Sequence, residues 1–354
     1  MTAAPTRAAR SRKTGSALPR YLLRRLGTSI VLLVGVTLVT FVLTALVPGD
    51  PIAAALGEGA IQNEATVQAY RERYGMDRSL PERYVLYLAA LLQGDLGTSI
   101  RTSRPVAEEL STALPATVEV AFWAIIVSLA VALVMGTVAA YRAGRISDQI
   151  VRVVSLVGLS VPTFWLAIMV YRLFFMELGW APGSGRLSPA LSPPPQFTGL
   201  YLVDFALDGD PVGFIDAAAH LVLPVLVLSL FTIGLLTRFI RTSVLEVLST
   251  DYIRAARAKG LPGRRIVLGY LLRGASLPIL TMVGIAFGAL LSGTVLVEAV
   301  FAWPGLGTYA YYAAINLDLP AVMGVGLVVG VVYVVINLIV DLLYGVLDPR
   351  VRLG

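Results

Sequence analysis

The sequence is poor in the residues on which metal and redox chemistry depend. Its 354 residues include no cysteine and a single histidine, His220. Without cysteine there is no disulfide framework and no thiolate metal site, and one histidine cannot hold a metal ion without partner ligands. We therefore expect His220 to serve in packing at the outer start of a membrane span.

The sequence also lacks the glycine-rich loop that cradles nucleotide phosphates. That loop reads Gly-x-x-x-x-Gly-Lys-Ser/Thr, whereas Lys13 has no such glycines before it and Lys259 is followed by Gly260. Neither a nucleophile–base pair nor a metal cluster is evident. The chain is therefore predicted to be no enzyme and to hold no cofactor. If it moves a solute uphill, the energy must come from a partner.

Charged residues are scarce as well, at 14% of the chain against 57% hydrophobic residues. Soluble domains carry about 25% charged residues, so this composition predicts an all-α integral membrane protein. An apolar helix of about 20 residues spans the roughly 30 Å bilayer core, and the first apolar run is longer than the roughly 7–15 residues of a signal-peptide core. Six spans are predicted, at residues 28–47, 116–141, 150–176, 218–239, 277–299 and 321–347.

The basic residues predict the orientation of these spans. Six spans place both termini on one side, and the segments on that side hold 20 of the 28 arginine and lysine residues. Such segments are cytoplasmic by the positive-inside rule, so the net charge of +6 reflects topology and no nucleic-acid partner is expected. The predicted parts are a disordered basic tail (1–19), transmembrane helix 1 (20–47), an extracytoplasmic loop region (48–115) and a core with helices 2–6 (116–354), including a cytoplasmic loop (243–276).

The cytoplasmic loop contains a short basic stretch that is predicted to be a capped helix, Ser249-Thr-Asp-Tyr-Ile-Arg-Ala-Ala-Arg-Ala-Lys-Gly-Leu-Pro262. Thr250 or Asp251 can accept hydrogen bonds from the first-turn amides. Gly260 can adopt the left-handed terminating conformation, and Pro262 prevents continuation. Such a helix, with small residues on one face and a charged border, fits a groove of another protein. A solvated helix that only links two spans is the alternative.

This stretch, followed by Leu277-Pro278, resembles the coupling loop of binding-protein-dependent ABC importer permeases. More narrowly, the stretch resembles the peptide, nickel and glutathione branch of this family, and within that branch the first of the two permease subunits. Arg254 stands where a glutamate is frequent in the wider superfamily, and the spacing to Leu277-Pro278 is long, but both departures are usual in the peptide branch. Further matching motifs are Thr40–Pro51, Leu114-Pro-Ala-Thr117, Leu159–Trp165, Val295-Leu-Val-Glu298, Phe301-Ala-Trp-Pro-Gly-Leu-Gly307 and Leu347-Asp-Pro-Arg350.

The resemblance implies a type I ABC importer permease fold with six transmembrane helices in the bacterial inner membrane. It implies four partners: a second homologous permease, two ABC ATPase subunits that bind ATP and magnesium, and an extracytoplasmic substrate-binding protein that delivers short peptides or a related solute. The contact with the ATPase is expected through Tyr252, Ala255, Ala256 and Gly260. The residues expected in coupling are Asp251, Tyr252, Arg254, Ala255, Ala256, Arg257, Lys259 and Gly260.

The outer loops are expected to differ from each other. Residues 64–92 have helical periodicity, first at Val67, Tyr70 and Tyr74 and again at Tyr84, Tyr87, Leu88 and Leu91. By resemblance, this region would face the binding protein; the alternative is a cap without a partner. The second loop, residues 178–217, is rich in proline, glycine and serine, so it is expected to have little regular structure.

A few span residues suggest either packing or a solute pathway. Glu298 lies near the outer end of the fifth span, where an anchor and a functional group are equally expected. Asn337 and Asp341 are one helical turn apart and are expected to bridge spans by hydrogen bonds. Arg172 is expected to reach the outer interface. Gly284-x-x-x-Gly288 permits a close helix approach.

Two other classes of protein remain as alternatives. A secondary transporter or channel would need no ATPase and usually shows internal repeats with polar or broken midplane helices, and no convincing repeat is present. A scaffold or sensor would need no large outer loop matched to a delivery protein. The identity of the solute is not readable from the sequence.

Overall fold

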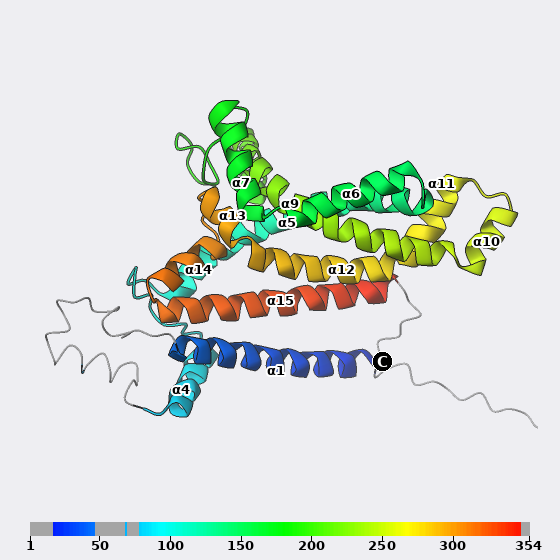
Figure 1. Ribbon diagram of the computed structural model, residues 1–354. Coiled ribbons are helices and arrows are strands. Elements are labelled where there is room, and N and C mark those ends of the chain that lie inside the picture. The colour runs from blue at the N-terminus through cyan, green and yellow to red at the C-terminus, as the bar shows by residue number, and fades with distance from the viewer. Residues whose placement is uncertain (1–16, 47–67, 69–77, 348–354) are drawn as a thin grey trace, which may run out of the picture.

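The computed structural model describes residues 17–46, 68 and 78–347, and within these ranges the chain is helical, without strands apart from an isolated bridge between Thr98 and Pro105 (Figure 1). Five helical segments are long and apolar enough to cross a membrane, and a bent pair gives a sixth. This confirms the predicted all-α membrane fold. The single-segment spans are α1 (Ala17–Leu46), α5 (Val106–Tyr141), α9 (Pro211–Leu248), the run of α11 (Gly263–Ile266), η2 (Val267–Leu271) and α12 (Leu272–Gly293), and α15 (Leu319–Leu347).

The third predicted span is broken rather than straight. Helix α6 (Ile146–Ser160) and helix α7 (Thr163–Tyr171), with its continuation η1 (Arg172–Glu177), meet at an angle of 92°. The break falls at Val161-Pro162, where both residues are extended and Pro162 is the N-cap of the next helix. Proline disfavours the helical conformation in the residue before it. The third predicted span, residues 150–176, therefore consists of two helices that meet at this bend.

The fifth predicted span ends earlier than residue 299. Helix α12 stops at Gly293, and a separate short helix, α13 (Val295–Val300), carries Glu298. Helix α14 (Leu306–Ile315) follows and packs against α13 and α15. Glu298 thus lies within a separate short helix and not at the end of the fifth span.

Helices α5 and α9 form the centre of the fold, and α6, α7 and α12 pack around them. Helix α1 packs on α15, and α15 packs on α12. The last contact uses the predicted small-residue motif, because a Cβ atom at Gly284 would lie 2.8 Å from Val340 and one at Gly288 would lie 3.0 Å from the Tyr333 ring. The close helix approach expected there is confirmed.

The described part of the region after α1 contains helix α4 (Leu80–Leu92), as the second half of the periodicity predicts. The backbone amide of Ser79 donates to the Glu82 carboxylate (3.0 Å), and hydrogen bonds from Ser79 lower the pKa of that carboxyl group. The Tyr84 hydroxyl donates to the Val34 carbonyl (3.1 Å) and so attaches α4 to α1. The tail before residue 17, the periodic residues Val67, Tyr70 and Tyr74, the turn at residues 48–51 and the motif that ends at Arg350 lie wholly or mostly outside the described residues.

The second outer loop has more structure than its composition predicts. It contains helix α8 (Tyr201–Asp208), and α9 begins within it at Pro211, where the Asp210 side chain accepts from the Val212 and Gly213 amides. The expectation of little regular structure was wrong for its second half. The loop before α8 is held by buried polar groups described below.

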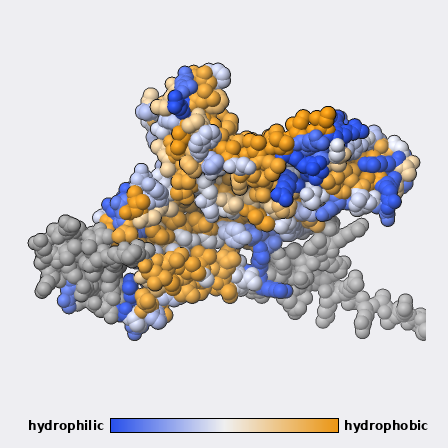
Figure 2. Space-filling model, viewed as in Figure 1, coloured by the Kyte–Doolittle hydropathy of each residue, from blue (hydrophilic) through white to orange (hydrophobic). Residues whose placement is uncertain are grey.

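The spans run between two ends of the molecule (Figure 1). The described beginning of α1 and the end of α15 lie at the same end as α11 and the short helix α10 (Asp251–Ala258), whereas α4 and α14 lie at the other. In Figure 2 the middle of the molecule is largely hydrophobic, and hydrophilic residues gather toward α10 and α11. Both described ends of the chain therefore lie on one side of the apolar band. We call the α10 side the coupling end and the α13–α14 side the far end.

Candidate functional site

Helix α10 begins and ends where the sequence predicts. Thr250 is the extended N-cap residue, but its hydroxyl donates back to the Val247 carbonyl (2.6 Å) and caps no amide of the helix. Gly260 has a φ of +72°, which is the left-handed conformation that glycine adopts without strain. Pro262 follows and starts the next helix, α11. The boundaries are confirmed, and side-chain capping by Thr250 is not.

The face that α10 turns inward differs from the expected contact face. Ile253 and Ala256 are 0% and 4% exposed and belong to the main hydrophobic core. Tyr252, Ala255 and Gly260 are exposed. Ala256 is therefore corrected from a contact residue to a packing residue, because the i, i+3 pair it forms with Ile253 attaches the helix to its own chain.

The charged residues of α10 border its outer surface. Arg254 pairs with Asp251 on the same helix, and both side chains are exposed. The Arg257 guanidinium lies 5.9 Å from the centre of the Tyr141 ring at the end of α5. Lys259 occupies the C-cap and is exposed. The result is a helix with an apolar inner face and a basic outer rim.

An ion cluster around the buried Asp148 connects the helix that leads into α10 with α6. Asp148 on α6 is fully buried and accepts from Arg241 on α9 (2.7 and 3.0 Å) and from Arg152 (2.6 Å). It also accepts from the Gly144 amide (2.9 Å). We call these three side chains the Asp148 clamp. Sequence reasoning missed it; the only local signal is the Asp148–Arg152 spacing of four residues within a helix.

Glu298 is the centre of a second polar cluster, at the far end. Its carboxylate is 2% exposed and accepts from the Thr117 hydroxyl (2.6 Å) and from the Thr308 amide (3.0 Å). The same hydroxyl accepts from the Leu306 amide (2.7 Å). A Cβ atom at Gly305 would lie 2.5 Å from the Glu298 carboxylate, so glycine at this position lets the backbone lie close to that group. These contacts make Glu298 a packing anchor between α5, α13 and α14.

Of the two polar residues on α15, Asn337 and Asp341, only Asp341 contacts another span. Asp341 pairs with Arg25 of α1 at 2.5 Å, so it does bridge two spans. Asn337 instead donates to the Tyr333 carbonyl of its own helix (2.8 Å). Asp341 therefore joins two spans by an ion pair and not by the expected hydrogen bond, and no bridge from Asn337 is found among the described residues.

Another buried pair lies between α5 and the second outer loop, and sequence reasoning missed it too. Arg186 donates to Glu119 at 2.6 Å, with side-chain exposures of 6% and 2%. The Arg186 guanidinium stacks 3.6 Å from the centre of the Tyr201 ring, and Glu119 also accepts from the Leu202 amide (2.9 Å). This cluster fixes the loop and α8 on α5.

The remaining candidates have local roles. His220 is 5% exposed, and its Nδ1 lies 2.9 Å from the Asp216 carbonyl, as packing at a boundary requires. Arg172 is exposed and pairs with Glu177 at 2.9 Å. Within the described ranges, no group of three or more histidine, aspartate or glutamate side chains is placed to hold a metal ion.

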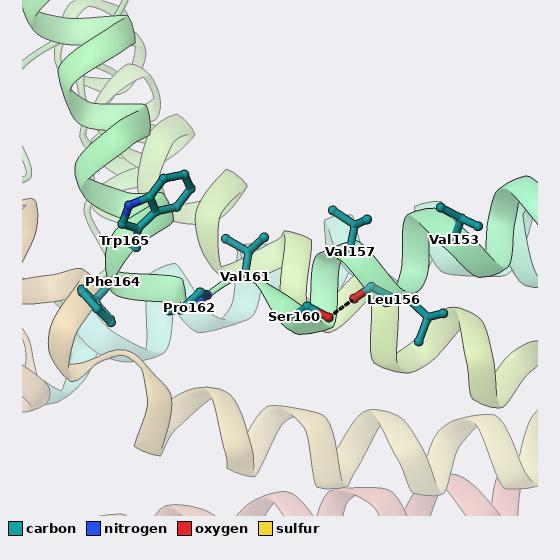
Figure 3. Close-up of a pocket in the computed structure, with 8 residues that line it drawn as sticks. All are labelled: Val153, Leu156, Val157, Ser160, Val161, Pro162, Phe164 and Trp165. Atoms are coloured by element: carbon teal, nitrogen blue, oxygen red, sulfur yellow. Dashed lines mark hydrogen bonds between the residues drawn. The ribbon is translucent and has the colours of Figure 1, made fainter.

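The bend between α6 and α7 forms an apolar groove of about 570 Å³. Figure 3 shows Pro162 at its corner, Trp165 on α7, and Val153, Leu156 and Val157 along α6. The Ser160 hydroxyl donates to the Leu156 carbonyl (2.8 Å), so the one hydroxyl group in the lining is internally satisfied. The groove therefore offers shape and apolar surface and little hydrogen bonding.

These features agree with two family models. The model described as "Binding-protein-dependent transport system inner membrane component" matches residues 132–353, and the model of the N-terminal part of such components matches residues 18–121. The chain belongs to this family, the permeases of binding-protein-dependent ABC importers. The resemblance predicted from the coupling-loop motif is confirmed, and the secondary-transporter, channel and scaffold alternatives are set aside.

Relatives match along nearly the whole chain. The probable D,D-dipeptide transport system permease protein DdpB of Escherichia coli K12 is 45% identical over 94% of this chain and 98% of that protein. The di/tripeptide transport system permease protein DppB of Pseudomonas aeruginosa is 40% identical, with the same two coverages. A solved structure of the MetNI methionine ABC transporter covers 69% of this chain and 94% of that chain, at 18% identity and a TM-score of 0.45.

Proposed function

We propose that this chain is one of two related permease subunits of an ATP-driven importer that takes up short peptides delivered by a binding protein. The observation that carries the proposal is full-length similarity to permeases whose names specify D,D-dipeptides, dipeptides or di- and tripeptides. ATP and magnesium would be bound by separate ATPase subunits, consistent with the missing phosphate loop.

Helix α10 is the proposed contact with an ATPase subunit. Tyr252 and Ala255 provide its exposed apolar and small residues, Arg254, Arg257 and Lys259 border them, and Gly260 ends the helix. Helix-in-groove contacts of this kind use one face of a short helix. Its inner residues Ile253 and Ala256 fasten the helix to the core, so a push on α10 reaches the rest of the chain.

The push is proposed to travel along α9. Only Ser249 and Thr250 separate α9 from α10, and Arg241 links α9 to Asp148 at the start of α6. Rigid helices and buried ion pairs transmit displacement because they resist deformation. Movement of α6 would then change the position of the α6–α7 bend and its groove, which is how closure of the ATPases would drive alternating access.

Both termini and α10 are proposed to be cytoplasmic. The bias of basic residues supports this, and so does the common location of both described chain ends and α10 (Figure 1). The absence of cysteine gives a clean background for a test. In intact cells, Ala89→Cys in α4 should react with a membrane-impermeant maleimide, whereas Ala258→Cys should react only after permeabilisation. The reverse pattern contradicts the orientation.

The docking proposal is tested by Ala255→Arg in the complete importer. Ala255 is exposed, so folding should be kept, while a long charged side chain should obstruct the groove of the ATPase. We expect loss of ATPase co-purification and at least about a tenfold drop in ATP-driven uptake of radiolabelled Ala-Ala into proteoliposomes, the equivalent of about 1.4 kcal/mol in contact free energy.

The matched control is Ala89→Arg, an equal change at an exposed alanine of α4 at the far end. It should keep ATPase co-purification at the wild-type level. Wild-type recovery and uptake in Ala255→Arg would show that α10 is not the docking helix. Co-purified ATPase with uptake of other solutes but no peptide would contradict the proposed substrate while keeping the importer assignment.

A further inference from the structure

A pocket of about 290 Å³ lies beside the Asp148 clamp, between residues 151–159 of α6 and residues 237–242 of α9. Three arginines line it: Arg152, Arg238 and Arg241. Apolar side chains of α6, among them Leu156, complete the wall. The pocket thus combines a high local density of guanidinium groups with an apolar side.

The clamp does not neutralise this charge. Asp148 pairs with both Arg152 and Arg241, so one carboxylate serves two guanidinium groups. Arg238 is exposed and has no ion pair in the part of the chain that the structure describes. Three guanidinium groups and one carboxylate leave the pocket positively charged, which favours an anionic ligand.

Two buried hydroxyl groups in the same lining lack a partner. Ser155 and Thr237 are 7% and 1% exposed, and within the described ranges neither hydroxyl oxygen has a hydrogen-bond partner. A buried polar group without a partner costs free energy, and such groups in folded proteins call for an explanation. An acceptor-rich anion in the pocket would satisfy both hydroxyl groups.

We propose that this pocket binds a phosphate group, with Arg152, Arg238 and Arg241 supplying charge and Ser155 and Thr237 donating hydrogen bonds. A guanidinium group matches phosphate oxygens in geometry as well as in charge. The phosphate could be that of a lipid headgroup or a free phosphate. Leu156 lines both this pocket and the apolar groove of Figure 3, so an acyl chain has a path along α6.

The test uses the full-length protein, stripped of lipid in a neutral maltoside detergent, and follows its unfolding temperature as probe is added. A ligand that binds the folded state raises this temperature with its concentration. The probes are dihexanoyl phosphatidylglycerol, inorganic phosphate, and dihexanoylglycerol, which has the same acyl chains without phosphate. We expect stabilisation by at least one phosphate-bearing probe and none by dihexanoylglycerol.

The variants separate the pocket from general surface charge. Arg238→Gln should weaken phosphate-probe binding about tenfold, because a charged hydrogen bond is lost. Thr237→Val, which keeps the side-chain size, should weaken it about threefold. Arg273→Gln, the same change at an exposed arginine of α12 outside the pocket, should have less than about a twofold effect.

Each outcome decides the proposal. Stabilisation by phosphatidylglycerol but not by inorganic phosphate supports the site with a lipid headgroup as its ligand, and equal stabilisation by both supports it with a free anion. The proposal is overturned if neither phosphate-bearing probe stabilises the protein or if dihexanoylglycerol is as effective. It is also overturned if Arg273→Gln weakens binding as much as Arg238→Gln.

Discussion

The buried clusters at the far end and helix α10 at the coupling end satisfy their polar groups in opposite ways. At the far end, Glu298 and Arg186 are buried and are held by hydrogen bonds within the chain. At the coupling end, α10 buries only Ile253 and Ala256 and leaves its basic side chains exposed. The far-end clusters thus pair their buried charges within the chain, whereas α10 leaves its charged side chains exposed.

This difference indicates where the fold resists change and where it tolerates change. Buried charges with paired partners are costly to disturb, because removing one partner leaves the other uncompensated. Exposed residues on a short helix contribute little to stability, so substitutions there should leave the fold intact. Substitutions that exchange these properties between the two ends test the comparison directly.

The largest effect is expected from Glu119→Gln at the far end. The change leaves the buried Arg186 guanidinium without its counter-charge, which should cost about 3–5 kcal/mol of unfolding free energy. Thermal unfolding in detergent, followed by the loss of helical circular dichroism, measures it. The control is Glu177→Gln, the same substitution in the exposed Arg172–Glu177 pair, with an expected cost of about 0–1 kcal/mol. Equal costs would mean that burial does not distinguish these pairs.

An intermediate effect is expected from Ala256→Leu on α10. Ala256 is in the core, so the added carbon atoms should overpack it and cost about 1–3 kcal/mol. Ala255→Leu, on the exposed side of the same helix, should change stability by less than about 0.5 kcal/mol. Unfolding midpoints of the two variants provide the measurement. A greater cost at Ala255 would reverse the assignment of the faces of α10.

The smallest effect is expected from Tyr309→Phe, which removes a hydrogen bond at the far end. The Tyr309 hydroxyl donates to Glu109 (2.8 Å), and its loss should cost about 1 kcal/mol at neutral pH. Tyr312→Phe, an exposed tyrosine of α14 with no hydroxyl hydrogen bond to a described residue, should cost less than about 0.5 kcal/mol.

The stability difference between wild type and Tyr309→Phe should also depend on pH. Burial, and then the Glu109 acceptor, raise the pKa of Tyr309, so the folded chain keeps its proton where the unfolded chain loses it. The stabilisation is therefore complete below the ordinary tyrosine pKa of about 10 and is lost as pH rises through the folded-state pKa. The stability gap between wild type and Tyr309→Phe should narrow above about pH 10. A gap that widens there would contradict this reasoning.

Helix α10 has boundaries that the sequence predicts and an orientation that it does not. The boundaries of α10 follow from local chemistry, because Gly260 and Pro262 terminate a helix whatever surrounds it. The inward direction of Ala256 does not, because a helix of eight residues with small and basic side chains has more than one acceptable face. Its orientation is decided by where Ile253 finds the core.

The proline residues within the spans likewise do not show from sequence alone where a helix bends. Pro115, Pro224 and Pro278 lie inside continuous helices, whereas Pro162 coincides with a 92° bend. Each proline removes one backbone hydrogen bond, and neighbouring groups decide whether the helix continues or turns. The apolar pattern therefore predicts the third span without indicating the bend within it.

The membrane class, the apolar runs, the boundaries of helix α10 and the family could all be predicted from the amino-acid sequence, because hydrophobicity, charge bias and motif spacing are local properties of the chain. The buried pairs, in contrast, depend on how the helices pack. Glu119–Arg186, Asp148–Arg241 and Thr117–Glu298 join residues 67, 93 and 181 positions apart. Hydrophobic burial is non-directional, so the apolar pattern brings helices together without specifying which polar side chains will meet between them.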